Sequence, residues 1–496
     1  MAWSLAQVAQ HNSATSCWVI IDNNVYDVTA FLPDHPGGSK VILQYAGRDA
    51  TAAFEPIHPS DALQKSLPTD KHLGPLTTGA IESLSLRSAQ RRKSHDEERV
   101  ERAQSSKPPI DRMLSLRDLE QVARNVLSHK ALSYYSSAAD DEITYAENER
   151  AFGRFFFWPR ILRPVAQCDP SATILGHRSS IPVFVCGAAL AKLGHPLGEA
   201  NITRGAYSTG IIQMVSTNAS LSFAEIAQAR GSPEQVLFSQ LYKPKDMALA
   251  EARVREIENL GYKAIFLTVD AVVAGNRERD IRAPFELEDM ETASANGQIA
   301  EKPRTLEDAQ NGEGLVTSVE GGGTAGALLQ NDELNMSWEE TIPWLRSITK
   351  LPLVLKGIQS VADAVLAADT GLNGIMLSNH GGRQLEFAMP PLEILHRLRK
   401  ERPDIFDKLE VYIDGGLRRG TDILKALCLG AKAVGIGRPF LYAQSAYGEA
   451  GVVKTVRILE RELVIGMRLL GARSVRELIP EMVERVDWQA RGLAKL

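Results

Sequence analysis

Residues 374–385 read GIMLSNHGGRQL. The apolar and small residues at its start predict a buried strand over 374–380, and the glycine pair at 381–382 predicts a tight turn beyond it. The end of this strand would carry an imidazole, His380, and a guanidinium, Arg383. An imidazole titrates near neutral pH, and a guanidinium can bind a carboxylate through two nitrogens. The stretch therefore fits removal of a proton from a small anchored acid, although a histidine and an arginine on an ordinary loop would fit it equally well.

Seven other apolar, β-rich runs accompany this strand: 181–187, 211–216, 236–242, 264–270, 352–357, 411–416 and 433–439. Segments with helical periodicity, such as 245–260, 361–369 and 391–402, lie between them. Eight strand–helix units in about 260 residues predict an α/β fold, a TIM (β/α)8 barrel. A doubly wound open sheet is the alternative.

Polar residues stand at the carboxyl ends of these runs, where barrel enzymes have their active sites. They are Ser216, Gln240, Tyr242, Thr268, Asp270, Lys356, His380, Asp414, Gly437 and Arg438. The turns DGGLRRG (414–420) and GIGRP (435–439) follow the last two strands, where such barrels bind phosphate. Arg418 or Arg438 would donate to that phosphate. Each turn alone also fits a plain loop, but the two together favour a phosphate site.

A separate domain is indicated at the N-terminus. The run WVIIDNNVYD (18–27) predicts a hairpin around the two asparagines. His35 lies just before a Pro-Gly-Gly turn, and His58 follows in AFEPIHPSDA (53–62). Two histidines on opposing loops could ligate a metal, and haem iron is the natural candidate because no cysteine or carboxylate stands nearby at zinc-like spacing. Two surface histidines beside turn prolines are the alternative.

Composition narrows the class of protein. The 496 residues are 44% hydrophobic and 24% charged, with a net charge of −5, so no basic field favours nucleic acid. The four cysteines are far apart, which argues against a disulfide framework or a zinc site and favours a reducing compartment. No apolar run reaches the roughly 18 residues of a membrane span.

We expect three regions: a haem-binding domain over 1–78, a polar linker over 79–108 and a barrel domain over 109–496. The linker is too polar and too mixed in charge to bury a core of its own. Within the barrel, residues 288–338 are too long and polar for an ordinary loop and are expected to form a mobile insert. The first residues lack the features of a secretory signal or a mitochondrial presequence. This predicts a cytoplasmic protein if Met1 is the true start, or one of the mitochondrial intermembrane space if a presequence was removed.

Two resemblances sharpen these expectations. Residues 5–79 resemble the cytochrome b5 haem-binding domain, through VYDVTAFLPDHPGG and GRDATAAFEPIHP. From about residue 115 the chain resembles the FMN-dependent 2-hydroxy acid dehydrogenases and oxidases, through YYSSAADDEITYAENERAF, LTVDAVVAGNRERDIR, LSNHGGRQL and IDGGLRRGTDILKALCLGAKAVGIGRP. A chain with both parts resembles the cytochrome-linked L-lactate dehydrogenases of that family.

The resemblance implies roles for matching residues. His380 would be the base, and Asp270 its ionic partner, able to raise the imidazole pKa. The substrate would be held by two arginines and two tyrosines, with one further residue at its side chain: Arg277, Arg383, Tyr134, Tyr242 and Asn218. Lys356 would stabilise the reduced flavin. FMN would also contact Ala189, Ser216, Gln240, Thr268, Asp414, Gly416, Arg418, Gly437 and Arg438. His35 and His58 would be the axial ligands of a b-type haem.

The implied reaction is oxidation of an L-2-hydroxy acid, L-lactate by default, to the 2-oxo acid. Electrons would pass from FMN to haem and on to a one-electron acceptor such as cytochrome c, in a homotetramer. Asn218 departs from the pattern, because lactate-oxidising members have an apolar residue there; an unpaired amide would favour a more polar or larger substrate. The alternatives are an oxidase that passes electrons to O2 and produces hydrogen peroxide, and a non-catalytic haem carrier or flavin isomerase.

Overall fold

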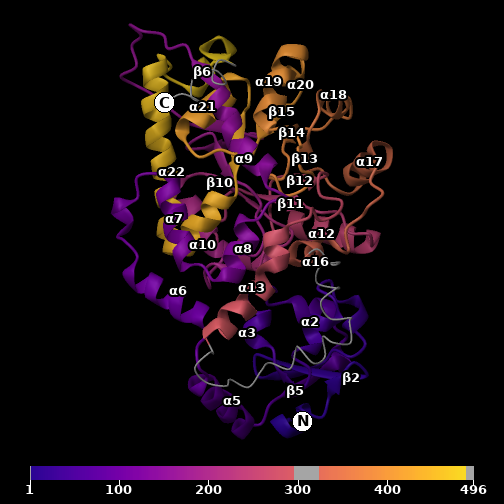
Figure 1. The fold of residues 1–496 in the computed structure, drawn as a ribbon. Helices are drawn as coiled ribbons and strands as arrows, with labels where there is room; N and C mark the ends of the chain where they lie inside the picture. Colours follow the sequence, from indigo (N-terminus) through magenta and orange to yellow (C-terminus); the bar gives the residue numbers. More distant parts are fainter. Residues whose placement is uncertain (1, 295–322, 487–496) are drawn as a thin grey trace.

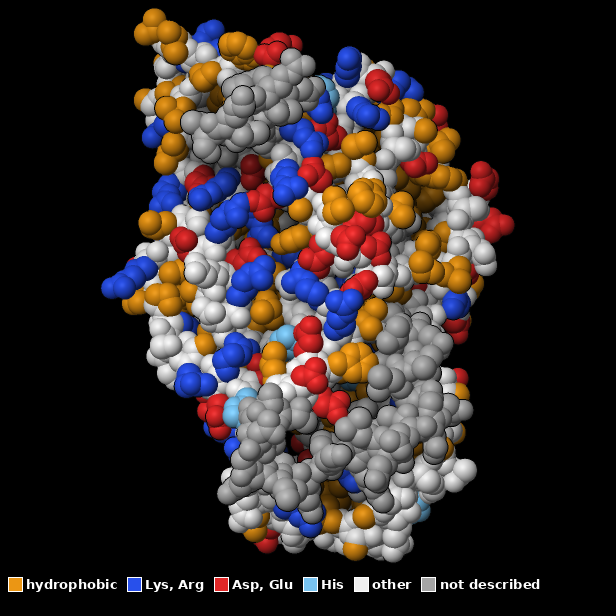
Figure 2. Space-filling model, in the orientation of Figure 1, with side chains coloured by type: hydrophobic (Ala, Val, Ile, Leu, Met, Phe, Trp, Pro, Cys, Tyr) orange, Lys and Arg blue, Asp and Glu red, His pale blue; other side chains and the backbone are white. Residues whose placement is uncertain are grey.

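The computed structural model describes residues 2–294 and 323–486. A small N-terminal domain, in indigo, lies beside one end of a larger barrel domain, and the helices that follow it run alongside toward the barrel (Figure 1). Positive and negative side chains are interspersed over the face drawn in Figure 2, in keeping with the small net charge. Within the described residues, no helix has both the length and the apolar character needed to cross a membrane.

The N-terminal domain is built on a five-stranded sheet with the order β1-β2-β3-β5, and β4 pairs with β2. The hairpin turn uses Asp22 and Asn23, both at positive φ, one residue earlier than predicted. Successive residues of β2 face two small cores, Val19 and Ile21 on one side and Ile20 on the other. The elements are α1 (Leu5–Val8), β1 (Asn12–Ser13), β2 (Ser16–Ile21), β3 (Asn24–Asp27), α2 (Ser39–Leu43), β4 (Arg48–Asp49), α3 (Thr51–Phe54), α4 (Ala62–Ser66) and β5 (His72–Pro75).

Residues 79–108, expected to be a solvated linker, hold two helices, α5 (Thr78–Gln90) and α6 (His95–Ser106). Arg99 of α6 donates hydrogen bonds to the backbone carbonyls of Asn125 and Leu127 in the barrel domain. Lys107 donates to the carbonyl of Ala446 at 2.7 Å. Polar contacts therefore hold the segment against the barrel domain. Such contacts need no apolar core, so the low apolar content of the segment did not reveal them.

Eight parallel strands close into a barrel in chain order, and the last pairs with the first. This confirms the predicted TIM barrel and rules out the open doubly wound sheet. The strands are β9 (Val183–Val185), β10 (Ile212–Val215), β11 (Leu237–Leu241), β12 (Ile265–Thr268), β13 (Leu353–Ile358), β14 (Gly374–Leu377), β15 (Glu410–Ile413) and β16 (Ala433–Ile436). Each coincides with a predicted run, although β13 extends one residue beyond its run and β15 begins one residue before.

Helices cover the outside of the barrel (Figure 1). Those before the first barrel strand are α7 (Leu116–Val126), α8 (His129–Ser136) and α9 (Ile143–Arg150). Those between and after the strands are α10 (Glu199–Thr209), α11 (Phe223–Gln228), α12 (Met247–Asn259), α13 (Glu278–Ser294), α16 (Gly323–Leu329), α17 (Trp338–Ile348), α18 (Val361–Asp369), α19 (Pro391–Glu401), α20 (Ile405–Lys408), α21 (Gly420–Cys428) and α22 (Arg438–Leu470). Most of the expected mobile insert, residues 295–322, lies outside the described residues, whereas α16 belongs to the described part.

The inside of the barrel is filled by side chains. Phe184, Phe238, Phe266 and Tyr412 form a buried aromatic cluster there. Ile174 joins the same cluster from the hairpin of β7 (Ala172–Ile174) and β8 (His177–Ser179). A short sheet of β6 (Phe155–Phe157) and β17 (Val483–Arg485) lies outside the barrel. With its interior packed, the barrel can offer a ligand site at its mouth but not through its axis.

Candidate functional site

One cavity lies at the carboxyl ends of the barrel strands, with about 1200 Å³ of unfilled space that includes open solvent. Most of the predicted barrel-site residues line it: Tyr134, Ala189, Ser216, Asn218, Tyr242, Arg277, Lys356, His380, Arg383, Asp414, Gly416, Arg418, Gly437 and Arg438. Three further predicted residues have side chains that solvent barely reaches: Gln240, Thr268 and Asp270. Each of these side chains is hydrogen-bonded to another predicted residue.

His380 is held between a carboxylate and a phenol. Its Nδ1 donates to Asp270 Oδ1 at 3.0 Å, and Tyr242 Oη lies 3.3 Å from its Nε2. Because a carboxylate can only accept, Nδ1 carries the proton of the neutral ring and Nε2 is left as the basic nitrogen. His380 has a positive φ of 56°, which turns the chain sharply after β14. A Cβ on the next residue, Gly381, would come within 2.8 Å of Arg438 Nη1, so only glycine fits there without a shift.

His380 and Asp270 have opposite charge preferences. Burial lowers the pKa of His380 and the positive charge of Lys356 lowers it further, while Asp270 raises it. The expectation that Asp270 raises the imidazole pKa is right for its own contribution, but the net direction is downward. Burial also disfavours the ionised form of Asp270, yet Lys356 and His380 outweigh burial and hold its pKa below the usual range. The site therefore pairs a neutral imidazole with an ionised carboxylate at neutral pH.

Lys356 is the buried cation of β13. Burial disfavours its charge, but Asp270 and Asp414 outweigh burial and raise its pKa, so it stays protonated. Its Nζ lies 3.6 Å from Asp414 Oδ2 and donates to Ser378 Oγ at 3.3 Å. Asp414 Oδ2 also accepts from the thiol of Cys186 at 3.4 Å. Asp414 Oδ1 is buried and has no hydrogen-bond partner among the described residues, so it could accept from a ligand hydroxyl.

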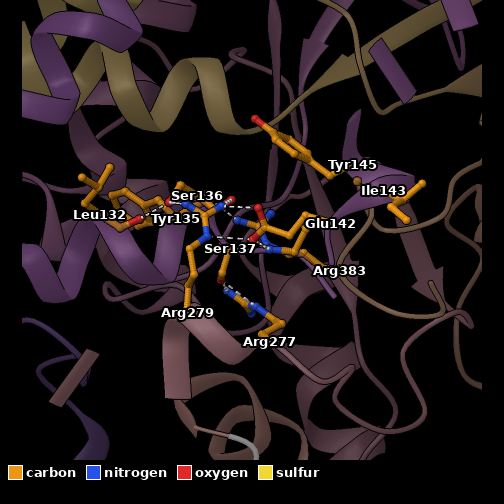
Figure 3. A network of polar contacts seen from close by, with 12 residues as sticks. Leu132, Tyr135, Ser136, Ser137, Glu142, Ile143, Tyr145, Arg277, Arg279 and Arg383 are labelled. Carbon is orange, nitrogen blue, oxygen red and sulfur yellow. Dashed lines mark hydrogen bonds and ion pairs between the residues drawn. The ribbon is translucent and has the colours of Figure 1, made fainter. Parts of the chain in front are cut away.

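Three arginines converge on residues 135–137, at the end of α8. Figure 3 shows two of them, Arg277 and Arg383, directed toward these residues. Arg277 Nε donates to Ser137 Oγ at 3.0 Å, and Arg383 Nη2 donates to the carbonyl of Tyr135 at 2.5 Å. Arg438 donates to the carbonyls of Tyr135 and Ser137, at 3.0 and 2.9 Å. Neutral acceptors, the main-chain carbonyls and the Ser137 hydroxyl, thus orient the three guanidinium groups without cancelling their charge.

This cluster needs an anion. Burial and the neighbouring charges of Arg438 and Arg277 lower the pKa of Arg383 well below its usual range. Its Nε is buried and finds no acceptor in the described parts of the chain. A bound carboxylate or phosphate would supply both an acceptor and a compensating charge. Arg418, expected at the phosphate, is already paired, with Nη1 2.8 Å from a carboxylate oxygen of Glu120.

A hydrogen-bonded row runs across three neighbouring strands. Ser216 Oγ donates to Gln240 Oε1 at 3.2 Å, and Gln240 Nε2 donates to Thr268 Oγ1 at 2.9 Å. The row fixes the amide of Gln240 behind the cavity wall. Polar groups in this order could read the hydrogen-bonding edge of a planar ring, and the cations nearby could hold its phosphate. The cavity therefore fits the expected FMN.

Asn218 is not unpaired. Its Nδ2 donates to the carbonyl of Leu328, at the end of α16, at 3.4 Å. Leu328 and its neighbours Ala325 and Leu329 line the same cavity. The start of α16 is fixed as well, because the backbone N–H of Ala325 donates to the buried Asp280 at 3.1 Å. The expectation of a polar substrate rested on an unpaired Asn218 amide, and the structure pairs that amide. The residues of α16 give the cavity an apolar wall.

His35 and His58 face each other in the N-terminal domain, with ring centroids 6.1 Å apart. Their Nδ1 atoms each lie 3.1 Å from a backbone carbonyl, of Gly38 and Phe54 respectively. Each Nδ1 therefore carries the proton, and each Nε2 is free to bind a metal. The separation suits one iron bonded at about 2 Å to each ring. Burial lowers the pKa of His58 to about 4, which keeps it in the neutral, ligating form. The two residues fit the expected haem.

Sequence reasoning missed the groups that orient the arginines. Two of these groups are the main-chain carbonyls of Tyr135 and Ser137. Every residue has a main-chain carbonyl, so the sequence cannot single these out. Tyr145 was within a recognised motif but was not singled out: Arg438 lies 4.6 Å from its ring centroid, and its hydroxyl accepts from Arg418 at 3.1 Å. The sequence did offer a signal for Tyr145: it is an aromatic residue inside one of the stretches that carry the family resemblance.

Comparison with known proteins agrees with both parts. The family model of the FMN-dependent dehydrogenases matches residues 123–485, and that of the cytochrome b5-like haem/steroid binding domain matches residues 4–77. The chain is 45% identical to the L-lactate dehydrogenase (cytochrome) of Wickerhamomyces anomalus, over 96% of this chain and 79% of that protein. It is 38% identical to 2-hydroxyacid oxidase 1 of Homo sapiens, over 76% and 98%. The flavin-binding domain of baker's yeast flavocytochrome b2 superposes with a TM-score of 0.70 at 40% identity, over 81% and 94%.

Proposed function

The chain belongs to the FMN-dependent dehydrogenase family and carries a cytochrome b5-like domain, and on that premise we propose that it oxidises L-lactate to pyruvate and passes the electrons through its haem to a one-electron acceptor. Bound FMN supplies the two-electron acceptor and bound haem the one-electron carrier. One observation carries the proposal: a neutral His380, paired with an ionised Asp270, faces the same cavity as the uncompensated arginine cluster.

The residues divide the work of binding and proton transfer. Arg383 binds the substrate carboxylate through its unpaired Nε, and Arg277 adds a second positive charge beside it. Tyr134 and Tyr242 line the cavity and donate to the carboxylate and the hydroxyl. His380 accepts a proton from the substrate at Nε2, and Asp270 stabilises the imidazolium that forms.

The residues at the end of the cavity where the last two strands finish would hold FMN. Arg438 and Gly437 would bind its phosphate together with Arg418, which keeps its carboxylate partner. Asp414 and the backbone of Gly416 would contact the chain that joins ring and phosphate. Ser216, backed by Gln240 and Thr268, would bond to the ring, and Ala189 would pack on it through its backbone. Lys356 would stabilise the negative charge of the reduced form. His35 and His58 would hold the haem.

L-lactate is the substrate best supported. A named relative, 45% identical over most of the chain, is an L-lactate dehydrogenase (cytochrome). The partner at Asn218 and the apolar wall of α16 favour a small apolar side chain on the substrate. The same relative's name supports a cytochrome, such as cytochrome c, as the external acceptor.

We also propose a homotetramer. Val273, Leu385 and Phe387 are 60%, 72% and 76% exposed, although they flank the loops that carry the site. A contiguous patch of exposed apolar side chains usually marks a contact between proteins. Light scattering after size exclusion measures the assembly directly.

The function is tested by visible spectra under anaerobic conditions. On addition of L-lactate, we expect the flavin absorbance to bleach first and the haem bands to shift to the reduced form afterwards. A panel of other 2-hydroxy acids, including glycolate and mandelate, then defines the substrate. If no 2-hydroxy acid bleaches the flavin, the proposal is wrong.

The same experiment separates the oxidase alternative. An oxidase would bleach its flavin while the haem stayed oxidised, and admitting O2 would restore the flavin with formation of hydrogen peroxide. Haem reduction before O2 is admitted, with little peroxide afterwards, supports the dehydrogenase.

A further inference from the structure

One short segment of the N-terminal domain contacts the barrel domain, and it carries a haem-ligand candidate. In this segment, residues 56–65, the carbonyl of Pro56 accepts a hydrogen bond from Ser220 Oγ at 2.9 Å. Ile57 packs against the hydrophobic core of the barrel domain. His58 follows directly. Further along, Ser60 lies close enough to the Glu225 carboxylate to help lower its pKa.

On the barrel side, Ser220 belongs to the loop that follows β10 and leads from the cavity wall. Its side chain is fully buried. Its Oγ accepts from the backbone N–H of Lys192 at 3.2 Å, and its own N–H donates to Glu199 Oε1 at 2.9 Å. The same Glu199 oxygen accepts from the N–H of Ala191 at 3.0 Å. A buried carboxylate thus joins two cavity-lining loops, and Ser220 joins both to the N-terminal domain.

We propose that Ser220 is a positioning residue for electron transfer between the two cofactors: it fixes the His58 segment against the loop that lines the flavin cavity. The inference rests on the proposed function for its electron-transfer consequence, but the docking contact itself does not. His58 is two positions after Pro56, and Ser220 is four positions after Ser216, so the contact links the two sites by a short covalent and hydrogen-bonded route.

Among these contacts, loss of the Ser220 hydrogen bond should weaken the docking of the two domains most. The ion pair between Lys65 and Glu256, at 3.1 Å, joins the same surfaces, but the Lys65 side chain is 56% exposed and the pair is screened by solvent and salt. The Ser220 hydroxyl is buried, and its removal would leave the Pro56 carbonyl without its donor. A part-buried acceptor left unpaired weakens docking more than a lost surface ion pair.

The first experiment is stopped-flow spectroscopy of the holoenzyme carrying Ser220→Ala. With L-lactate and no O2, flavin bleaching should keep its parental rate, whereas the haem should be reduced roughly tenfold more slowly, because the docked form is less populated. A fall in both rates by the same factor would show that Ser220 supports the flavin cavity instead, and unchanged haem reduction would show that it does not hold the domains. Either result overturns the inference.

The second experiment does not depend on activity. Hydrogen–deuterium exchange of the holoenzyme should show faster uptake in residues 54–60 and 218–222 of the Ser220→Ala variant. Ser179→Ala is the matched control: Ser179 is equally buried, on the β7–β8 hairpin, and its Oγ donates to the carbonyl of Val183 within the barrel domain. Unchanged exchange in both segments would overturn the docking role, even if no 2-hydroxy acid reduced the flavin and the proposed function had failed.

A third variant covers the case in which Ser220→Ala does not fold. Ser60→Ala removes the neighbouring contact from the exposed surface of the N-terminal domain and leaves the barrel sequence intact. It should also slow haem reduction, by a smaller factor, with flavin bleaching unchanged. Haem reduction at the parental rate in this variant, at high ionic strength where the Lys65 pair is screened, would contradict the inference.

Discussion

At the scale of single residues, the chemistry centres on His380. We expect His380→Gln to keep FMN bound and to lose reduction of the flavin by substrate, by at least about 100-fold, since glutamine cannot accept the proton. Anaerobic stopped-flow bleaching measures the rate, and the flavin absorbance of the purified variant checks binding. Bleaching at the parental rate would show that another group is the base.

The pH dependence follows from the same residue. Only neutral His380 can accept a proton, and its pKa is lowered by burial and by Lys356. The kcat/KM should therefore fall on the acid side only below the ordinary imidazole pKa of about 6.5. Asp270 raises this pKa. The Asp270→Asn variant should therefore lose kcat/KM at a lower pH on the acid side, and its maximal kcat/KM should also be lower. Asp404→Asn, at an exposed carboxylate outside the site, should leave both unchanged. An acid limb that moves upward in Asp270→Asn would contradict the assignment.

The sequence identified these residues but not their energetics. His380 and Asp270 stand at strand ends, which a pattern of apolar runs locates well. The direction of the His380 pKa depends on how deeply it is buried and on the distance to Lys356, and neither can be read from spacing. For Asn218, the partner is 110 positions away at Leu328, so sequence alone left an amide that seemed unpaired.

At the scale of elements, α16 is the least predictable part of the site and the most open to test. Leu328→Ala would enlarge the apolar wall of the cavity. The ratio of kcat/KM for 2-hydroxybutyrate to that for L-lactate should rise roughly tenfold, because each methylene in such a pocket changes discrimination by about that much. Leu334→Ala, at a half-exposed leucine after α16, is the control. An unchanged ratio would mean that the substrate side chain does not reach α16.

The barrel strands and the linker show where element prediction succeeds and fails. Eight apolar runs bounded by glycines and polar residues sufficed for the barrel, since strands buried on both faces leave a continuous signal. The helix α6 is signalled more weakly by its sequence. Its Ser94 and Glu97 form a capping box that the sequence displays, but its anchoring to the backbone carbonyls of Asn125 and Leu127 is a tertiary contact.

At the scale of the whole molecule, two cofactor sites act in series. His58→Ala should remove the haem and leave the flavin reducible by L-lactate at its parental rate. Reduction of cytochrome c should then be lost, whereas a small oxidant that takes electrons directly from the flavin should still be reduced. Spectra of the purified variant and steady-state assays with each acceptor test this. Cytochrome c reduction at the parental rate without haem would refute the relay.

The hydrogen bond between Ser220 and Pro56 is chemically one-sided. The barrel contributes a side-chain hydroxyl to it, whereas the N-terminal domain contributes a main-chain oxygen. Any residue at position 56 that keeps the loop conformation presents the same oxygen. Position 56 of the electron carrier can therefore vary during evolution while the barrel must retain its donor. A chimaera with a foreign domain of the same fold should couple to this barrel if its loop follows the same path, which makes the carrier an exchangeable module.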